Sequence, residues 1–342
     1  MSPETILVTG AAGGVGSTAQ TAIAILLAQR HRVRAMVHKL DARADALRDM
    51  GAEVALGDML DILAVRAAMQ GCSRVYFTMS ISPNFLEAAA NVAVTAKSLG
   101  VRAFVSLAQM TLSQMSETKT TSSPQQKQEW LTEQMLRWSS LPVVYLRPTA
   151  FFDGMFLLQG AKGIRDDGVI RLPFADGKTS LIAGADAGAA AAAVLANPEP
   201  HIGKVYDLTG PQSLTMAQIA QEFSGALGRP IQYVNVPPQV WETKLRESDV
   251  RRFPPPNSRA ATRQCSHLAD RRLQICRLHE RDERAQLARR VGANSLDCGD
   301  WKRCVCQSFL FGGPAAGQRL ERATHGIALR SAPNASRSAR VQ

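Results

Sequence analysis

Glycines at positions 10, 13 and 16 have the spacing of a turn that brings backbone close to a phosphate. They lie in the stretch ILVTGAAGGVGS (6–17), directly after an apolar run typical of a strand. The first glycine permits a tight turn, the second lets the backbone approach a pyrophosphate, and the third lets a helix pack closely. The start of that helix would face the phosphates. We therefore predict a dinucleotide-binding turn, with an ordinary glycine-rich loop as the alternative; its residues are Gly10, Ala12, Gly13, Gly14, Val15 and Gly16.

The residues after the second expected strand indicate which dinucleotide is bound. A protein that prefers NAD usually has Asp or Glu there, which binds the ribose 2′-hydroxyl. This chain has His38 and Lys39, followed by Arg43, and its carboxylate comes only at Asp41. Because cations suit a 2′-phosphate, we expect NADPH, with NADH as the alternative.

A parallel sheet is needed to bring these residues to one edge. Apolar, β-branched runs alternate with helix-length segments through the first 150 residues. This alternation predicts an α/β fold: a doubly wound parallel sheet of the Rossmann type, with helices on both faces. Ligands should bind beyond the carboxyl ends of the strands, which we place at 5–9, 33–37, 53–56, 74–79, 103–107 and 143–146.

The chain divides into three parts. Residues 1–150 form the expected NAD(P)-binding domain, and residues 151–250, with shorter strands and helices, a small substrate-covering subdomain. The second part contains an alanine-rich helix that we expect Asp186 to cap. Residues 251–342 are a tail rich in Arg and Cys, for which we expect disorder or a frame-shifted reading of the gene, with an unrelated extension as the alternative.

The net charge of +11 comes entirely from the tail. Residues 1–250 contain 22 Lys and Arg against 22 Asp and Glu, whereas residues 251–342 contain 18 against 7. The first 250 residues therefore lack the charge of a polyanion-binding protein, and nucleic-acid binding is a minor alternative for the tail alone. Five of the six cysteines also lie in the tail, without a Cys-x-x-Cys pair, so we expect no metal site.

Targeting and membrane segments are not expected. The N-terminus lacks the apolar core of a signal peptide, and the longest apolar stretch, 183–196, is mostly alanine and contains Asp186. We expect a cytoplasmic protein that does not contact a membrane.

Several stretches resemble the NmrA-like branch of the atypical short-chain dehydrogenase/reductases, which includes NADPH-dependent quinone and azo-dye reductases. The resemblance covers roughly residues 4–248. It implies that Asp58 lies near the adenine, Thr78 near a ribose and Pro148 against the nicotinamide; a helix cap and strand-end packing are the alternatives for Asp58 and Thr78. The stretches are TGAAGGVG (9–16), VRAMVHK (33–39), GAEVALGDMLD (51–61), LPVVYLRPTAFFDG (141–154), GADAGAAAAAVLANP (184–198) and GKVYDLTGPQSLTMAQIA (203–220).

The proton donor of conventional members of this superfamily is missing here. Those proteins use a Tyr-x-x-x-Lys pair with a helper Ser. In this chain the tyrosine position falls on Gln125, the lysine position on Glu129, and the serine position on Ala108 or Gln109. A quinone or azo acceptor could instead take its proton from water or from Lys127, which is otherwise a solvated helix residue.

The segment after the sixth expected strand is rich in aromatic residues. We expect Phe151 and Met155, with Phe152 and Phe156, to line a flat aromatic substrate, and core packing is the alternative. The polar stretch 109–128 is either a mobile flap beside the site or an inert surface loop.

The sequence as a whole predicts an NADPH-dependent reductase that transfers hydride to a quinone, azo or similar aromatic acceptor. The alternative is a non-catalytic NADP(H)-binding redox sensor that acts through a protein partner. An isomerase or dehydratase that uses NADP(H) structurally is a third possibility. The missing Tyr/Lys pair favours the sensor, whereas the neutral first 250 residues and the aromatic segment favour the enzyme.

Overall fold

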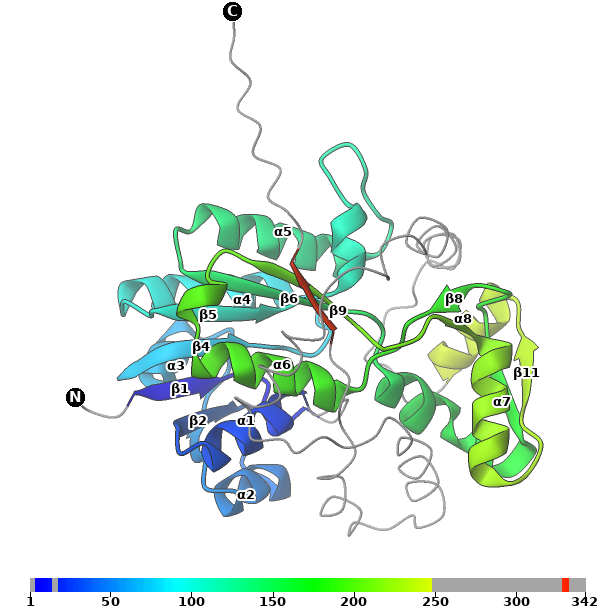
Figure 1. The fold of residues 1–342 in the computed structure, drawn as a ribbon. Helices are drawn as coiled ribbons and strands as arrows, with labels where there is room; N and C mark the ends of the chain where they lie inside the picture. The colour runs from blue at the N-terminus through cyan, green and yellow to red at the C-terminus, as the bar shows by residue number, and fades with distance from the viewer. Residues whose placement is uncertain (1–3, 14–17, 248–327, 332–342) are drawn as a thin grey trace, which may run out of the picture.

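An eight-stranded sheet forms the centre of the protein (Figure 1). The computed structural model describes residues 4–13, 18–247 and 328–331. The strand order is β12, β9, β6, β5, β4, β1, β2, β3, and all but β12 run parallel. This order confirms the predicted Rossmann-type sheet. The strands are β1 (Thr5–Val8), β2 (Arg32–Val37), β3 (Glu53–Leu56), β4 (Cys72–Phe77), β5 (Ala103–Leu107), β6 (Val143–Pro148), β9 (Val205–Thr209) and β12 (Ala328–Ser331).

Both faces of the sheet are buried, which explains the continuous apolar strands. In β1, Ile6 and Val8 point into one core and Leu7 into the other, because successive side chains of a strand alternate. The first core is closed by α1 (Thr18–Ala28), α2 (Ala42–Asp49) and α6 (Gly184–Ala196). The second is closed by α3 (Ile62–Met69), α4 (Phe85–Ser98) and α5 (Pro124–Trp138), on the opposite face (Figure 1).

Helix α6 packs unusually close to α1. A Cβ atom on Gly188 would lie 2.5 Å from the carbonyl oxygen of Thr18, so the contact requires a residue without a side chain. Asp186 does not cap this helix as we expected, because α6 begins earlier and its N-cap is Ala183. A side chain from elsewhere replaces it: Asp153 Oδ2 accepts a hydrogen bond of 2.7 Å from the Gly184 amide.

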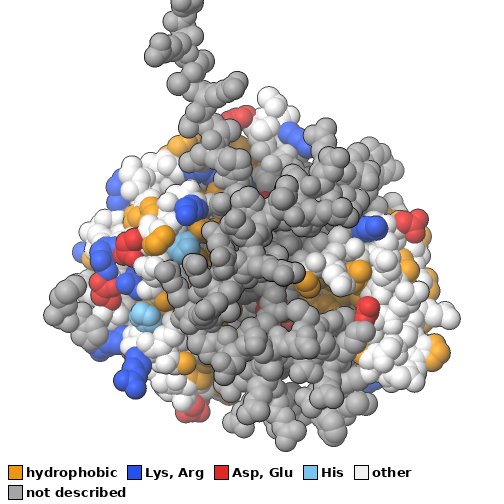
Figure 2. All heavy atoms as spheres, viewed as in Figure 1, with side chains coloured by type: hydrophobic (Ala, Val, Ile, Leu, Met, Phe, Trp, Pro, Cys, Tyr) orange, Lys and Arg blue, Asp and Glu red, His pale blue; other side chains and the backbone are white. Residues whose placement is uncertain are grey.

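A second, smaller unit has a hydrophobic core of its own, which includes Phe156, Ile170 and Phe223. It lies to one side of the sheet, and hydrophobic side chains gather on its inner side, toward the middle of the molecule (Figures 1 and 2). Its elements are β7 (Val169–Leu172), β8 (Lys178–Thr179), β10 (Leu214–Thr215), α7 (Met216–Leu227), β11 (Gln232–Asn235) and α8 (Pro238–Glu247), with π-helical segments at Asp153–Gly160 and Gly163–Asp167.

The structure differs from the expected boundary at residue 150. Helix α6 and strand β9 both follow that residue, yet β9 pairs with β6 in the main sheet, with Tyr145 opposite Val205. The chain thus leaves the sheet after β6, builds part of the second unit, returns to the sheet and then completes the second unit. The expected tail, 251–342, lies outside the described residues apart from β12.

Candidate functional site

The glycine turn lies at the carboxyl end of β1, tied to the end of β4. Thr9 Oγ1 donates to the Thr78 carbonyl oxygen (2.9 Å) and accepts from the Thr78 amide (3.1 Å). Gly10 has a φ of +62°, and a Cβ there would lie 2.4 Å from that same carbonyl oxygen. The Gly13 amide then donates to the Gly10 carbonyl (3.0 Å). Only glycine fits at position 10, as the sequence predicts for a tight turn.

The remaining residues of the predicted turn are only partly described. Ala12 is described, whereas Gly14, Val15 and Gly16 lie outside the described residues. Helix α1 is described from Thr18. Because this helix starts soon after the glycines in the sequence, we expect its N-terminal amides and the positive end of its dipole at this edge of the sheet.

Cationic side chains lie beside the turn. Arg43 Nη1 donates to the Ala12 carbonyl oxygen (3.0 Å), which places the guanidinium at the turn itself. The same guanidinium pairs with Asp41 and lowers the pKa of that carboxyl to about 2. His38 and Lys39 are exposed at the end of β2. The carboxyl edge of the sheet beside β2 therefore carries basic side chains, and the nearby Asp41 carboxylate forms an ion pair with Arg43.

Asp58 and Thr78 both make local contacts. Asp58 Oδ1 accepts a hydrogen bond from the Leu60 amide (2.9 Å), and its Oδ2 lies 3.5 Å from His38 Nδ1. Thr78 is buried, and its backbone holds the glycine turn. The helix-cap alternative for Asp58 is wrong, because the N-cap of α3 is Asp61. Buried Thr78 matches its alternative of packing at the strand end. Both residues lie at the carboxyl edge of the sheet, where we expect the cofactor.

The aromatic segment begins where β6 ends. Pro148 is buried, and Thr149 Oγ1 donates to the Ser180 carbonyl oxygen (2.5 Å). Phe152 stacks on Phe223, with ring centroids 6.0 Å apart, so it serves the core of the second unit. Phe151 packs against the sheet core and Met155 against the core of the second unit, and both stay half-buried. These two predicted substrate residues therefore lie where the two cores approach each other.

Three polar side chains converge beyond the carboxyl end of β5. Gln125 Nε2 donates to Glu129 Oε1 (2.6 Å), and Gln109 Nε2 donates to Glu129 Oε2 (2.7 Å). Gln125 and Glu129 lie one turn apart on α5, and both are buried. Burial raises the pKa of the Glu129 carboxyl, although the two amides act against this. The cluster occupies the positions at which the sequence comparison placed Tyr, Lys and Ser.

A second buried carboxylate on α5 has a different environment. Glu133 pairs with Arg137, one turn along the helix at 2.7 Å, and with Arg147 of β6 through both of its oxygens. This network ties α5 to the sheet beside the Glu129 cluster. Lys127, the proton donor suggested from the sequence, is exposed on α5, between the two buried positions Gln125 and Glu129. The structure does not bring it into the cluster.

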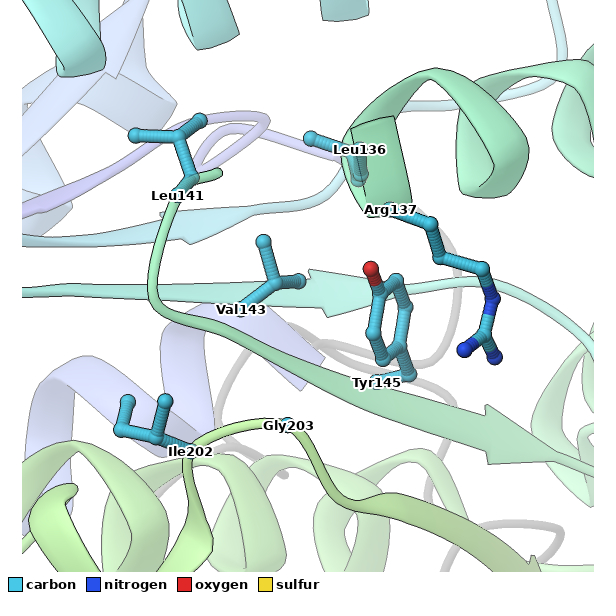
Figure 3. A pocket seen from close by; sticks show the side chains of 7 residues that line it. All are labelled: Leu136, Arg137, Leu141, Val143, Tyr145, Ile202 and Gly203. Atoms are coloured by element: carbon cyan, nitrogen blue, oxygen red, sulfur yellow. The ribbon is translucent and has the colours of Figure 1, made fainter. Parts of the chain in front are cut away.

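A shallow pocket of about 250 Å³ lies at the other edge of the sheet (Figure 3). Leu141 and Val143 at the start of β6, and Ile202 and Gly203 before β9, line it together with Tyr145. Because the glycine turn is at the carboxyl edge, this pocket is not the cofactor site. Among the described residues, no group of His, Cys, Asp and Glu could hold a metal ion, and no described helix is long and apolar enough to cross a membrane.

The residues at the carboxyl edge fit a dinucleotide that carries a 2′-phosphate. The close approach at Gly10 leaves bare backbone at the turn, and the adjacent charge at the end of β2 is cationic. Residues 2–263 match the NmrA-like family. The chain belongs to the NmrA-like family.

Proteins similar to this chain include reductases and a regulator. An NAD(P)H azoreductase of Xenophilus azovorans is 30% identical over 233 residues, which are 68% of this chain and 77% of that protein. An NADPH-dependent quinone oxidoreductase from Escherichia coli, solved with NADPH, shares the fold at a TM-score of 0.66 and 23% identity, over 89% of this chain and 98% of that one. NmrA itself, a negative transcriptional regulator solved with NADP, has a TM-score of 0.60 at 22% identity, over 69% and 75%.

Two features of the site go beyond the residues that the sequence analysis assigned. Arg43 was named only as one of the cations, and its contact with Ala12 joins positions 31 residues apart. The resemblance placed Gln125 and Glu129 at the Tyr and Lys positions and left Ala108 or Gln109 for the Ser position; the structure shows that Gln109 is the residue that meets Glu129.

Proposed function

We propose that this chain is an NAD(P)H-dependent oxidoreductase that reduces a quinone, azo or similar flat aromatic acceptor with NADPH. The observation that carries the proposal is the carboxyl edge of the sheet, where a bare glycine turn with Arg43 beside it and the cluster of Gln109, Gln125 and Glu129 both lie. The names of the azoreductase and the quinone oxidoreductase support the same chemistry.

Each part of this edge has a function in the proposal. The amides of the glycine turn hold the pyrophosphate, while Arg43, His38 and Lys39 bind the 2′-phosphate. Asp58 lies on the adenine side, and Thr78 and Pro148 position the nicotinamide half. NADPH, when bound, supplies a hydride to the acceptor. Phe151 and Met155 contact the aromatic acceptor between the two cores.

The test combines NADPH binding with turnover. Purified full-length protein is titrated with NADPH by fluorescence, and NADPH oxidation is then followed by absorbance with and without a panel of quinones and azo dyes. We expect tight binding and oxidation that requires an acceptor. NADPH oxidation that is equal with and without every acceptor would contradict the proposal.

A non-catalytic NADP(H)-binding sensor is the second candidate. The observation that favours it is the pair Gln125 and Glu129, which replaces the proton-donating Tyr/Lys pair of conventional relatives. This candidate predicts tight NADPH binding, no turnover with any acceptor, and a protein partner whose affinity differs between the NADP⁺ and NADPH forms.

A further inference from the structure

Glu129 is a buried carboxyl group whose described hydrogen-bond partners are neutral. Its two oxygens accept from the amides of Gln125 and Gln109 at 2.6 and 2.7 Å. Only 9% of the residue is exposed. An ionised carboxylate is costly to bury without a counter-charge, so burial favours the neutral acid.

Glu133 provides an internal comparison on the same helix. It is also buried, but two arginines, Arg137 and Arg147, neutralise it. Among the residues that the structure describes, the elements packed against α5 bring no such charge to Glu129. The short helix Met110–Gln114 has no ionisable side chain. On α4, Lys97 donates to the Ser139 carbonyl at the far end of α5, and Glu87 is exposed.

The glutamines can satisfy both protonation states of Glu129. A carboxamide has a donor end and an acceptor end, so it can donate to a carboxylate or, after turning over, accept from a carboxylic acid. Gln109 is held in its donating orientation, because Thr111 Oγ1 and Gln126 Nε2 both donate to its Oε1, at 2.8 and 3.5 Å. Gln125 is therefore the glutamine that turns over, while Gln109 donates to Glu129 in both protonation states. Glu129 can therefore release and recover a proton without leaving a buried polar group unpaired.

The position of the cluster matches the place where an acceptor would be reduced. Gln109 lies two residues beyond the carboxyl end of β5. The neighbouring strands are β4, which Thr78 follows, and β6, which ends at Pro148. In sheets of this type, ligands bind beyond these strand ends. The cluster also lies in the part of α5 that Glu133 ties to β6.

We propose that Glu129 is the proton donor of the reaction, with Gln109 and Gln125 as its positioning residues. The inference rests on the proposed reductase function. The acceptor receives a hydride from NADPH, which leaves as NADP⁺. As the O–H bond of the Glu129 carboxyl breaks, its proton forms an O–H bond on the reduced quinone, and the product is the hydroquinone. The carboxylate then takes a proton from water.

The test compares Glu129→Gln with Glu87→Gln, the same chemical change at an exposed position on α4. The first readout does not depend on activity. Infrared spectra of the full-length protein at neutral pH should contain the carbonyl band of a protonated carboxyl group, which Glu129→Gln removes and Glu87→Gln retains. Absence of this band from the wild-type protein would overturn the proposal.

The second readout is quinone reduction in single turnovers across a range of pH. We expect Glu129→Gln to lower the rate by about 100-fold or more, the range of general acid catalysis, with an unchanged Kd for NADPH. The wild-type rate should fall at high pH as Glu129 loses its proton, and Glu129→Asp should recover part of the rate. A rate and pH profile of Glu129→Gln equal to those of wild type would overturn the proposal.

The experiments distinguish a wrong role for Glu129 from a wrong reductase function. If the wild-type protein binds no NADPH or reduces no acceptor, the reductase function fails, whatever the infrared band shows. If the wild-type protein is active and Glu129→Gln is equally active, only the role of Glu129 fails. If Glu129→Gln does not fold, the wild-type band and the Glu129→Asp profile still decide.

Discussion

Gly10 shows how one residue can serve both the fold and the ligand. Its backbone passes so close to Thr78 that the ends of β1 and β4 are held together through Thr9, and this same approach leaves the turn free of side chains. Position 10 therefore requires a residue without a Cβ for two reasons: the backbone has a left-handed φ, and a Cβ would clash with the Thr78 carbonyl oxygen.

Gly10→Ala should destabilise the protein and weaken NADPH binding. The matched control is Gly100→Ala, because Gly100 has a similar φ of +66° but no atom within 4 Å of its would-be Cβ. We expect Gly100→Ala to lower the free energy of unfolding by roughly 1–2 kcal/mol, the cost of the backbone conformation alone. Gly10→Ala should cost more, because the added Cβ also clashes with Thr78. If urea unfolding showed the same loss of unfolding free energy for Gly10→Ala and Gly100→Ala, the close approach of Gly10 to the Thr78 carbonyl would be contradicted.

Lys39 and Arg43 should decide the choice between NADPH and NADH. We expect Arg43→Ala or Lys39→Ala to raise the KM for NADPH by about tenfold, equivalent to about 1.4 kcal/mol, and to leave the KM for NADH nearly unchanged. In Arg43→Ala, the released Asp41 carboxylate adds repulsion toward a 2′-phosphate. The control is Arg48→Ala, which removes an exposed arginine of α2 that pairs with Asp45. Equal losses for both cofactors would argue against a 2′-phosphate contact.

At the scale of elements, helix α5 carries the two buried carboxyl groups on one face. Glu133, with its arginines, attaches the helix to β6, and Glu129, with its glutamines, is the proton donor that we propose. Residues four apart share a helix face, so a single helix can hold both groups in fixed relation to the sheet. The ion-paired Glu133 and the Glu129 cluster therefore lie one turn apart on the same helix.

The contact between α1 and α6 is a second element-scale feature that can be tested. In Gly188→Ala the new Cβ would lie 2.5 Å from the Thr18 carbonyl oxygen, so the helices must separate, and we expect a loss of about 1–3 kcal/mol in the free energy of unfolding. Gly225→Ala on α7 is the control, because its Cβ would meet no atom within 4 Å. There we expect a gain of roughly 0.5–1 kcal/mol from helix propensity. Thermal unfolding of both variants should show opposite shifts.

At the scale of the whole molecule, the raised pKa of Glu129 makes stability depend on pH. The folded protein holds this proton to a higher pH than the unfolded chain does. The stabilising contribution is therefore fully present below the ordinary glutamate pKa and is lost as pH rises through the raised value. Between the ordinary glutamate pKa and the raised pKa of Glu129, the free energy of unfolding should fall by about 1.4 kcal/mol for each unit of rising pH.

Chemical denaturation across this pH range tests the expectation. The difference in unfolding free energy between wild type and Glu129→Gln should change with pH in the window, because glutamine has no proton to lose. Glu87→Gln should run parallel to wild type throughout. A constant difference between wild type and Glu129→Gln would show that the two states bind this proton equally.

The acceptor site that we propose lies between the sheet and the second unit. Phe151 and Met155 lie where the two cores approach, and the chain crosses between the units more than once, since β9 returns to the sheet. The predicted subdomain boundary at residue 150 marks only the first of these crossings. Disorder or a frame-shifted reading of residues 251–342 stays a prediction, and resequencing the gene tests the latter.

The sequence by itself determined what depends on neighbours along the chain. Apolar runs set the strands, glycine spacing set the turn after β1, and the cations after β2 indicated the 2′-phosphate, because burial and backbone conformation leave periodic local signals. Tertiary structure alone decided which distant residues meet. Three hydrogen bonds join residues that are 20 to 31 positions apart in the sequence. They link Arg43 to Ala12, Asp153 to Gly184 at the start of α6, and Gln109 to Glu129. Such contacts depend on how the strands are ordered and how the helices cross the sheet, and no local pattern carries that geometry.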